Sequence, residues 1–146
     1  MTRNASHPDT APTATLTLAG ATRVLDAAMA AAADHGVAVC ISVCDPGGHT
    51  VLTARMDGAP LLSQRIADDK AYTVIAFQGL PTSAWWGAIE HEPALVHGIT
   101  KTPRLIVFGG GAPVHADGHL VGAVGISGGS AEQDAAIAEA AAAAVR

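Results

Sequence analysis

VAVCISVCDPGGHTVLTARMDG, residues 37–58, is the stretch of sequence that decides the fold. Two runs rich in β-branched residues, 37–45 and 49–58, flank a Pro-Gly-Gly turn sequence, and this pattern predicts a β-hairpin. Strands joined by so short a turn pair antiparallel. The stretch therefore favours an antiparallel sheet with helices covering at least one of its faces.

Helical patterns lie on both sides of this hairpin. Apolar residues recur at helical spacing over 18–35, and a glycine follows as a stop. A second helical stretch runs from Pro60 to Gly79. Residues 82–98 predict one or two short helices broken at Pro93.

The C-terminal part of the sequence predicts three strands and a helix. The three short β-type runs are LIVF (105–108), GGGAPV (109–114) and HADGHLVGAVGIS (115–127). The Asp117-Gly118 pair within the last run is a strong hairpin signal. The final helix begins after Ser130, which forms a capping-box pattern with Gln133.

These elements predict a single α/β (α+β) domain. Their order is helix-β-β-helices-β-β-β-helix, which gives a five-stranded antiparallel sheet packed with helices. We expect residues 16–146 to form this domain. Residues 1–15 are polar and rich in Pro, Thr and Ala, and we expect them to form a disordered tail.

Composition narrows the classes of partner. Charged residues make up 14% and apolar residues 49% of the chain, so part of the surface must be apolar, which favours a homo-oligomer. The net charge is −5 and the eight Lys and Arg are scattered, so we expect no nucleic acid partner. The sequence shows no long apolar run and no secretory signal, so we expect no membrane span and a cytoplasmic protein. Cys40 and Cys44 lie too far apart along one strand to form a disulfide.

Six short motifs occur in order along the chain: DPGG at 45–48, RMDGA at 55–59, KAYTV at 70–74, GGGAPV at 109–114, VGAVGISGG at 121–129 and QD at 133–134. Together they resemble the GlcG/HbpS family, which includes the C-terminal domain of PduO-type proteins, over residues 16–146. The resemblance implies a compact α/β domain with a five-stranded antiparallel sheet, assembled as dimers up to octamers. Some members bind haem, so the resemblance makes haem a possible cofactor.

Lys70 is the most informative single residue, because it lies on the apolar stripe of the second helix. The apolar members of that stripe are Leu62, Ile66, Val74 and Phe77. Desolvation there would lower the pKa of the Lys70 amine and suit it to act as a base, a nucleophile or an anion anchor. Alternatively, Lys70 reaches solvent along its aliphatic stem, or pairs with a carboxylate such as Asp45 or Asp57.

Arg55 and His49 alternate onto one face of the second strand. An Arg55 guanidinium there could hold a carboxylate, including a haem propionate, and His49 could transfer a proton or ligate iron. Asp57, just after this strand, is a candidate ligand contact together with Arg55. The alternatives are a solvated His49 and a structural network between Arg55 and Asp57.

Two further groups are candidate ligand contacts. Trp85, Trp86 and His91 could line a flat apolar pocket for haem or another planar ligand, or could pack in a subunit interface. The amides of Gly128, Gly129 and Ser130 open the last helix and suit an anion, although the glycines could simply allow close helix–sheet contact. The seven histidines show no zinc-binding spacing and no CxxCH is present, so we expect no metal site and no covalent haem.

The favoured hypothesis is a protein that binds a small molecule, either haem or another planar or carboxylated ligand. The alternative is a cofactor-independent isomerase, tautomerase, hydratase or lyase that acts on a small carboxylated or carbonyl metabolite. In that enzyme Lys70 would be the base and His49 the acid. A third hypothesis is an accessory protein without a small ligand.

Overall fold

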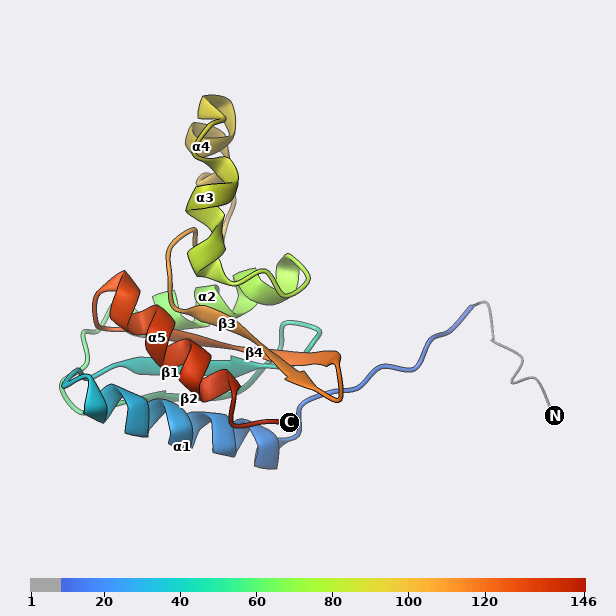
Figure 1. The fold of residues 1–146 in the computed structure, drawn as a ribbon, viewed down its shortest axis with the longest axis vertical. Helices are drawn as coiled ribbons and strands as arrows, with labels where there is room; N and C mark the ends of the chain where they lie inside the picture. The colour runs from blue at the N-terminus through green and yellow to red at the C-terminus, as the bar shows by residue number, and fades with distance from the viewer. Residues whose placement is uncertain (1–8) are drawn as a thin grey trace.

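A computed structural model describes residues 9–146 of the chain. Within this range the helices are α1 (Leu18–Asp34), α2 (Ser63–Ala76), α3 (Trp85–Ile89), α4 (Pro93–Ile99) and α5 (Ala131–Ala142), with a 3₁₀ turn at Thr82–Ala84. The strands are β1 (Cys40–Cys44), β2 (Thr50–Arg55), β3 (Gly111–Ala116) and β4 (His119–Ser127). Figure 1 shows how these elements are arranged.

Two hairpins lie side by side and give the strand order β2-β1-β4-β3, in which every neighbouring pair is antiparallel. Both predicted hairpins are confirmed. In the second, Asp117 and Gly118 have φ angles of 49° and 77°, as in a type I′ turn, whose twist matches that of the flanking strands. The first hairpin contains a register shift between Val43 and Cys44, which interrupts strict alternation along β2.

The prediction of a fifth strand at 105–108 is wrong. The sheet of the described chain has four strands, and residues 105–108 form an irregular segment. The backbone N–H of Ile106 donates to the Thr73 hydroxyl of α2 at 3.0 Å, and that of Leu105 donates to the Thr102 carbonyl. These amides are used by a helix side chain and a local turn, so the apolar run does not join the sheet.

Helices cover both faces of the sheet (Figure 1). On one face, α1 and α5 enclose the main core with Ile41 and Val43 of β1. On the other face, α2 packs against Cys40 and Cys44 of the same strand, because side chains alternate along a strand. The described residues thus form a single α+β domain, in which the sheet is the middle layer.

Glycines in β4 and β3 allow α2 to approach the sheet closely. A Cβ added to Gly125 would overlap the carbonyl oxygen of Ala67 in α2, and one added to Gly111 would lie 2.8 Å from the Lys70 carbonyl oxygen. Because a real Cβ does not tolerate such contacts, glycine is required where helix and strand touch. This close packing places Lys70 inside the domain.

A short helical arm, α3 and α4, projects away from the sheet (Figure 1). Pro93 opens α4, so the predicted break at this residue is confirmed, and of the one or two short helices expected the structure has two. No residue of α4 is buried. The arm begins and ends beside α2, where the 3₁₀ turn and residues 105–108 lie.

At the N-terminus, residues 9–15 contain no helix or strand. The rest of the predicted tail, residues 1–8, lies outside the described residues. None of the helices described is long and apolar enough to cross a membrane.

Candidate functional site

Lys70 forms a buried ion pair with Asp134 of α5. Its ammonium donates to Asp134 Oδ2 at 3.0 Å and to the Ile126 carbonyl oxygen at 2.7 Å. Burial lowers the pKa of the Lys70 amine, and attraction to the Asp134 carboxylate partly offsets that effect. A carboxylate partner was one of the two structural alternatives for Lys70, but the partner is Asp134 rather than Asp45 or Asp57.

Asp134 also organises the start of α5. Its second oxygen, Oδ1, accepts from the Gly129 N–H at 2.9 Å. The Ser130 N–H donates to Gln133 Oε1 at 3.0 Å, and the Gln133 N–H donates to Ser130 Oγ, so the predicted capping box is confirmed. The amides of Gly129 and Ser130 are therefore already bound by side chains of their own helix, which leaves them little capacity for an external anion.

His49 lies at the turn between β1 and β2, on the surface. Its Nδ1 lies 3.2 Å from Asp45 Oδ1, and the same carboxylate oxygen accepts the N–H groups of Gly47 and His49. Arg55 is the last residue of β2, so the strand separates it from His49 by about 20 Å. Arg55 donates to the Ala59 carbonyl oxygen at 3.3 Å. Asp57 is exposed, and no ion pair joins it to Arg55 in the described chain.

The two tryptophans have different environments. Trp85 is buried and packs edge-to-face on Phe77, with ring centroids 4.5 Å apart, and its indole Nε1 has no hydrogen-bond partner within the described residues. Trp86 is exposed and lines a pocket, whereas Trp85 does not. His91 is exposed in the arm, beside Glu90. The structure thus brings neither Trp85 nor His91 to the pocket of Trp86.

We call this cavity the aromatic pocket. It is an open groove of about 500 Å³ between the arm, residues 107–109 and one face of α5. Its lining residues are Ser83, Trp86, Val107, Phe108, Gly109, Ala131, Glu132, Ala135, Ala136 and Glu139. Phe108 joins the pocket to the buried ion pair, because the Lys70 ammonium lies 5.1 Å from the centre of its ring. Sequence reasoning missed Phe108, since it was assigned to a strand.

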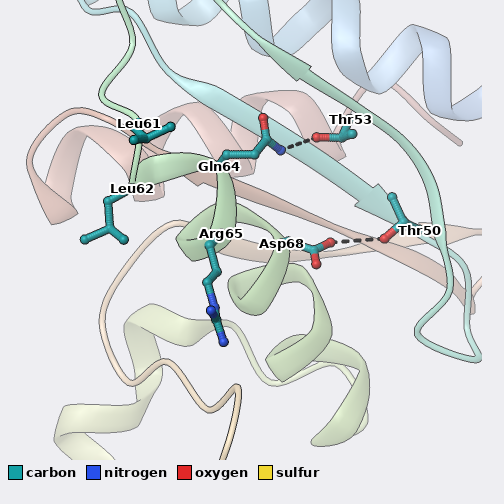
Figure 2. Close-up of a pocket in the computed structure, with 7 residues that line it drawn as sticks. All are labelled: Thr50, Thr53, Leu61, Leu62, Gln64, Arg65 and Asp68. Carbon is teal, nitrogen blue, oxygen red and sulfur yellow. Dashed lines mark hydrogen bonds between the residues drawn. The ribbon is translucent and has the colours of Figure 1, made fainter.

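A second cavity, the aliphatic pocket, lies between β2 and the N-terminal end of α2 (Figure 2). It is an open groove of about 430 Å³, and its lining residues are Thr50, Thr53, Leu61, Leu62, Gln64, Arg65 and Asp68. The prediction that Leu62 belongs to the buried stripe of this helix is wrong: Leu62 is exposed, because the buried face of α2 is formed by Ser63, Ala67, Lys70 and Val74. Nothing in the sequence singled out Arg65, which looks like an ordinary exposed helix residue.

The two cysteines are free and buried. Burial raises the pKa of the Cys44 thiol to about 12, and its Sγ lies 3.6 Å from the Ala71 carbonyl oxygen. A thiol with so high a pKa is a poor nucleophile at neutral pH. Among residues 9–146, no three His, Cys, Asp or Glu side chains converge to form a metal site.

Comparisons with known proteins agree with this fold. The model of the family described as haem degrading protein HbpS-like matches residues 16–143. An uncharacterized 15.0 kDa protein of Citrobacter freundii is 43% identical over 129 residues, covering 86% of this chain and 89% of that protein. The GlcG protein of Escherichia coli K12 is 33% identical over 107 residues, covering 73% of this chain and 77% of GlcG.

Among solved structures, the complex of PduOC with haem superposes with a TM-score of 0.79 at 32% identity, covering 90% of this chain and 96% of that one. The family match spans nearly the whole described domain, and the relatives cover most of it at identities above 30%. The chain therefore belongs to the HbpS-like family and is related to GlcG and to the C-terminal domain of PduO.

Proposed function

We propose that this protein binds a flat, largely apolar small molecule of the haem class in the aromatic pocket. The observation that carries the proposal is a pair of large aromatic side chains left half-exposed at one cavity. Trp86 is 56% exposed and Phe108 is 47% exposed, and both line the pocket. Aromatic faces in water are unfavourable, and a planar ligand that stacks on them removes them from water.

The size and chemistry of the pocket suit such a ligand. Its volume of about 500 Å³ lies within the range of small-molecule sites. The opposite wall is formed by the small side chains of Ala131, Ala135 and Ala136, which leave room for a ring. A haem complex of PduOC, a structural relative, supports the choice of ligand class.

The residues present fit the ring of haem better than its iron. The described lining of the pocket contains no His, Cys or Met, and its polar side chains are Ser83, Glu132 and Glu139, which offer oxygen atoms only. Trp86 and Phe108 would therefore hold the ring by stacking, while the carboxylates of Glu132 and Glu139 disfavour ligand propionates along the α5 wall of the pocket. Bound haem would supply redox chemistry, but recognition by this pocket does not depend on iron.

The enzymatic alternative stays a prediction with less support. The Lys70 amine is sealed from solvent and engaged by two acceptors, so it could act as a base only if the ion pair opened. His49, the predicted acid of that enzyme, lies at the exposed β1–β2 turn. No pocket described here is lined by both Lys70 and His49.

Self-association is part of the proposal. Helices as short as α3 and α4 are marginal on their own, and α4 buries none of its residues within one chain. A second copy that covers the arm would supply the missing contacts and would lie next to the aromatic pocket. We expect light scattering to give a mass larger than one chain; a monomer at all concentrations would contradict this part of the proposal.

The experiment that tests the proposed function is a parallel titration with haemin and with metal-free protoporphyrin IX. Because the pocket recognises the ring, both should bind with affinities within about threefold of each other. Trp86→Ala and Phe108→Ala should each weaken both ligands roughly five- to tenfold. Leu62→Ala is the matched control, since it removes an exposed apolar side chain from the other pocket.

Two results would overturn the proposal. In the first, haemin binds tightly and protoporphyrin IX does not, which would assign recognition to an iron ligand outside this pocket. In the second, the Trp86 and Phe108 variants bind both ligands as the wild type does.

A further inference from the structure

We propose that the aliphatic pocket is a second small-molecule site, which binds a monocarboxylate that carries an aliphatic chain. This site is separate from the aromatic pocket: the two share no lining residue. The proposal stands on the composition of the cavity, on the charge balance around it and on the bonds that hold its walls.

The apolar part of the site is a pair of leucines that the described part of the chain leaves largely exposed. Leu61 is 89% exposed and Leu62 is 68% exposed, and both line the pocket. Adjacent leucines so largely exposed to water are unfavourable, because burial of aliphatic side chains is favourable. Their side chains are aliphatic, so the part of the ligand that covers them is best an alkyl chain rather than a ring that requires stacking.

The polar part of the site is Arg65, which lies one helical turn after the leucines and lines the same cavity (Figure 2). Among the described residues, no carboxylate lies within 4.0 Å of its guanidinium. The guanidinium presents a planar set of N–H donors that matches a carboxylate in a bidentate arrangement. Arg65 is therefore available to an anionic group in the pocket.

Asp68 also lines the pocket, and its charge is partly compensated, because Arg104 is shared between Asp68 and Asp69. Arg104 lies 3.2 Å from Asp68 Oδ2, and Asp68 Oδ1 accepts hydrogen bonds from Ser42 and Thr50. Arg65 therefore balances the negative charge that Asp68, Asp69 and Arg104 carry together, so the region around the pocket is close to neutral. One positive charge with a carboxylate close by favours a monoanion over a doubly charged phosphate.

The walls are held in place without a ligand. Thr50 donates to Asp68 at 3.1 Å, and the Gln64 amide donates to the Thr53 hydroxyl, so two bonds tie β2 to α2 across the floor of the pocket (Figure 2). A site formed in advance loses little conformational freedom when it binds. This is the feature that distinguishes the cavity from a loose surface patch.

The test uses octanoate as the probe, titrated by calorimetry against the full chain, with octanol and octylamine as analogues of the same length. We expect octanoate to bind, and both analogues to bind at least roughly tenfold more weakly because they lack the group that Arg65 recognises. Arg65→Gln should weaken octanoate roughly tenfold, and Leu62→Ala should weaken it roughly threefold.

Two control variants make the assignment specific. Arg23→Gln removes an exposed arginine of α1 that does not line the pocket and should leave octanoate binding unchanged. Trp86→Ala should also leave it unchanged, so failure of this site and failure of the proposed haem-class site are distinguishable.

Three results would overturn the inference. Octanoate binding that survives Arg65→Gln would do so, as would equal binding of octanol or octylamine, which would indicate an unspecific apolar patch. The third is the absence of octanoate binding to the wild type, which overturns the inference by itself; the Leu61→Asp variant would then be measured for a smaller mass than the wild type. A smaller mass would make the leucines a contact between copies of the chain.

Discussion

Two acid–base pairs in this molecule have nearly the same geometry and opposite surroundings. The Lys70–Asp134 pair spans 3.0 Å and the His49–Asp45 pair 3.2 Å. The side chains of the first pair are 1% and 4% exposed, and those of the second are 81% and 27% exposed. Burial rather than distance decides what each pair does: solvent screens the exposed pair, whereas neither buried charge can lose its partner without a large penalty.

The difference also separates their roles. The buried pair joins α2 to α5 and β4, which are remote in sequence, and lies under the Phe108 ring of the aromatic pocket. The exposed pair belongs to a single turn between adjacent strands. We therefore expect changes at Lys70 to act on the whole domain, and changes at His49 or Asp45 to act on one loop.

The largest expected effect is that of Lys70→Met. Because this change leaves the Asp134 carboxylate buried without its partner, it should lower the free energy of unfolding by about 3–5 kcal/mol. Urea denaturation followed by circular dichroism measures the change. Lys101→Met, at an exposed position, is the control and should stay close to the wild type. A loss at Lys70 below about 1 kcal/mol would show that the buried pair behaves like a surface pair.

Gly110→Ala tests how tightly the buried pair is enclosed. An added Cβ would lie 2.5 Å from Lys70 Nζ and 3.0 Å from Asp134 Cβ, at a φ of 128°. We expect a loss of about 2–4 kcal/mol in the free energy of unfolding, from overpacking and backbone strain together. Gly36→Ala is the control that keeps the backbone strain without the overpacking, since Gly36 has a φ of 67° and no atom within 4 Å of the added carbon. Similar losses for the two variants would contradict close packing at Gly110.

The double variant Lys70→Met/Asp134→Asn tests whether the unpaired charge causes the loss. Asparagine removes the charge and keeps an oxygen that can accept from the Gly129 N–H. We expect the double variant to recover about 2 kcal/mol of the loss seen in Lys70→Met alone, measured by the same denaturation. If the loss in the double variant equals the sum of the losses in Lys70→Met alone and Asp134→Asn alone, charge pairing is not the cause.

The smallest expected effect is that of Asp45→Asn in the exposed pair. Slight burial raises the pKa of the Asp45 carboxyl, but the N–H groups of His49 and Gly47 and the His49 ring together lower it below its usual value. A carboxyl whose pKa is lower in the folded state stabilises the fold above its unfolded-state pKa of about 4, and this contribution is lost as the pH falls through the folded-state value.

Asp45→Asn should accordingly cost no more than about 1 kcal/mol at pH 7, and the difference from the wild type should shrink at pH below about 4. Denaturation at the two pH values measures it. If the difference in the free energy of unfolding between the wild type and Asp45→Asn grew on acidification, the lowered pKa of Asp45 would be contradicted.

Local patterns in the sequence predicted the elements that local interactions determine. The Asp117-Gly118 turn, the capping box at Ser130 and the division of the arm at Pro93 are all set by residues adjacent in the chain. The strand prediction for residues 105–108 was wrong, because the Ile106 N–H donates to the hydroxyl of Thr73, which lies 33 residues earlier in the chain. The strand propensity of residues 105–108 cannot indicate that a distant side chain will bind one of their backbone N–H groups.

The candidate site shows the same division. The helical spacing indicated that Lys70 faces the interior, but its partner Asp134 lies 64 residues away, and no spacing rule connects the two. Strict alternation placed His49 and Arg55 on one side of β2, but His49 precedes the strand and the register shift breaks the alternation. Trp86 was identified, while Phe108 was not, because the pocket assembles residues from segments that only the fold brings together.

The most direct test of the proposed function is to map where protoporphyrin IX binds, by amide and indole chemical shifts of isotope-labelled protein. We expect shift changes at the Trp86 indole N–H and at the amides of Gly109, Ala131 and Ala135, with little change from Thr50 to Arg55. Changes centred instead on His49 and Asp45, or on Leu61 and Arg65, would contradict the assignment of the ligand to the aromatic pocket.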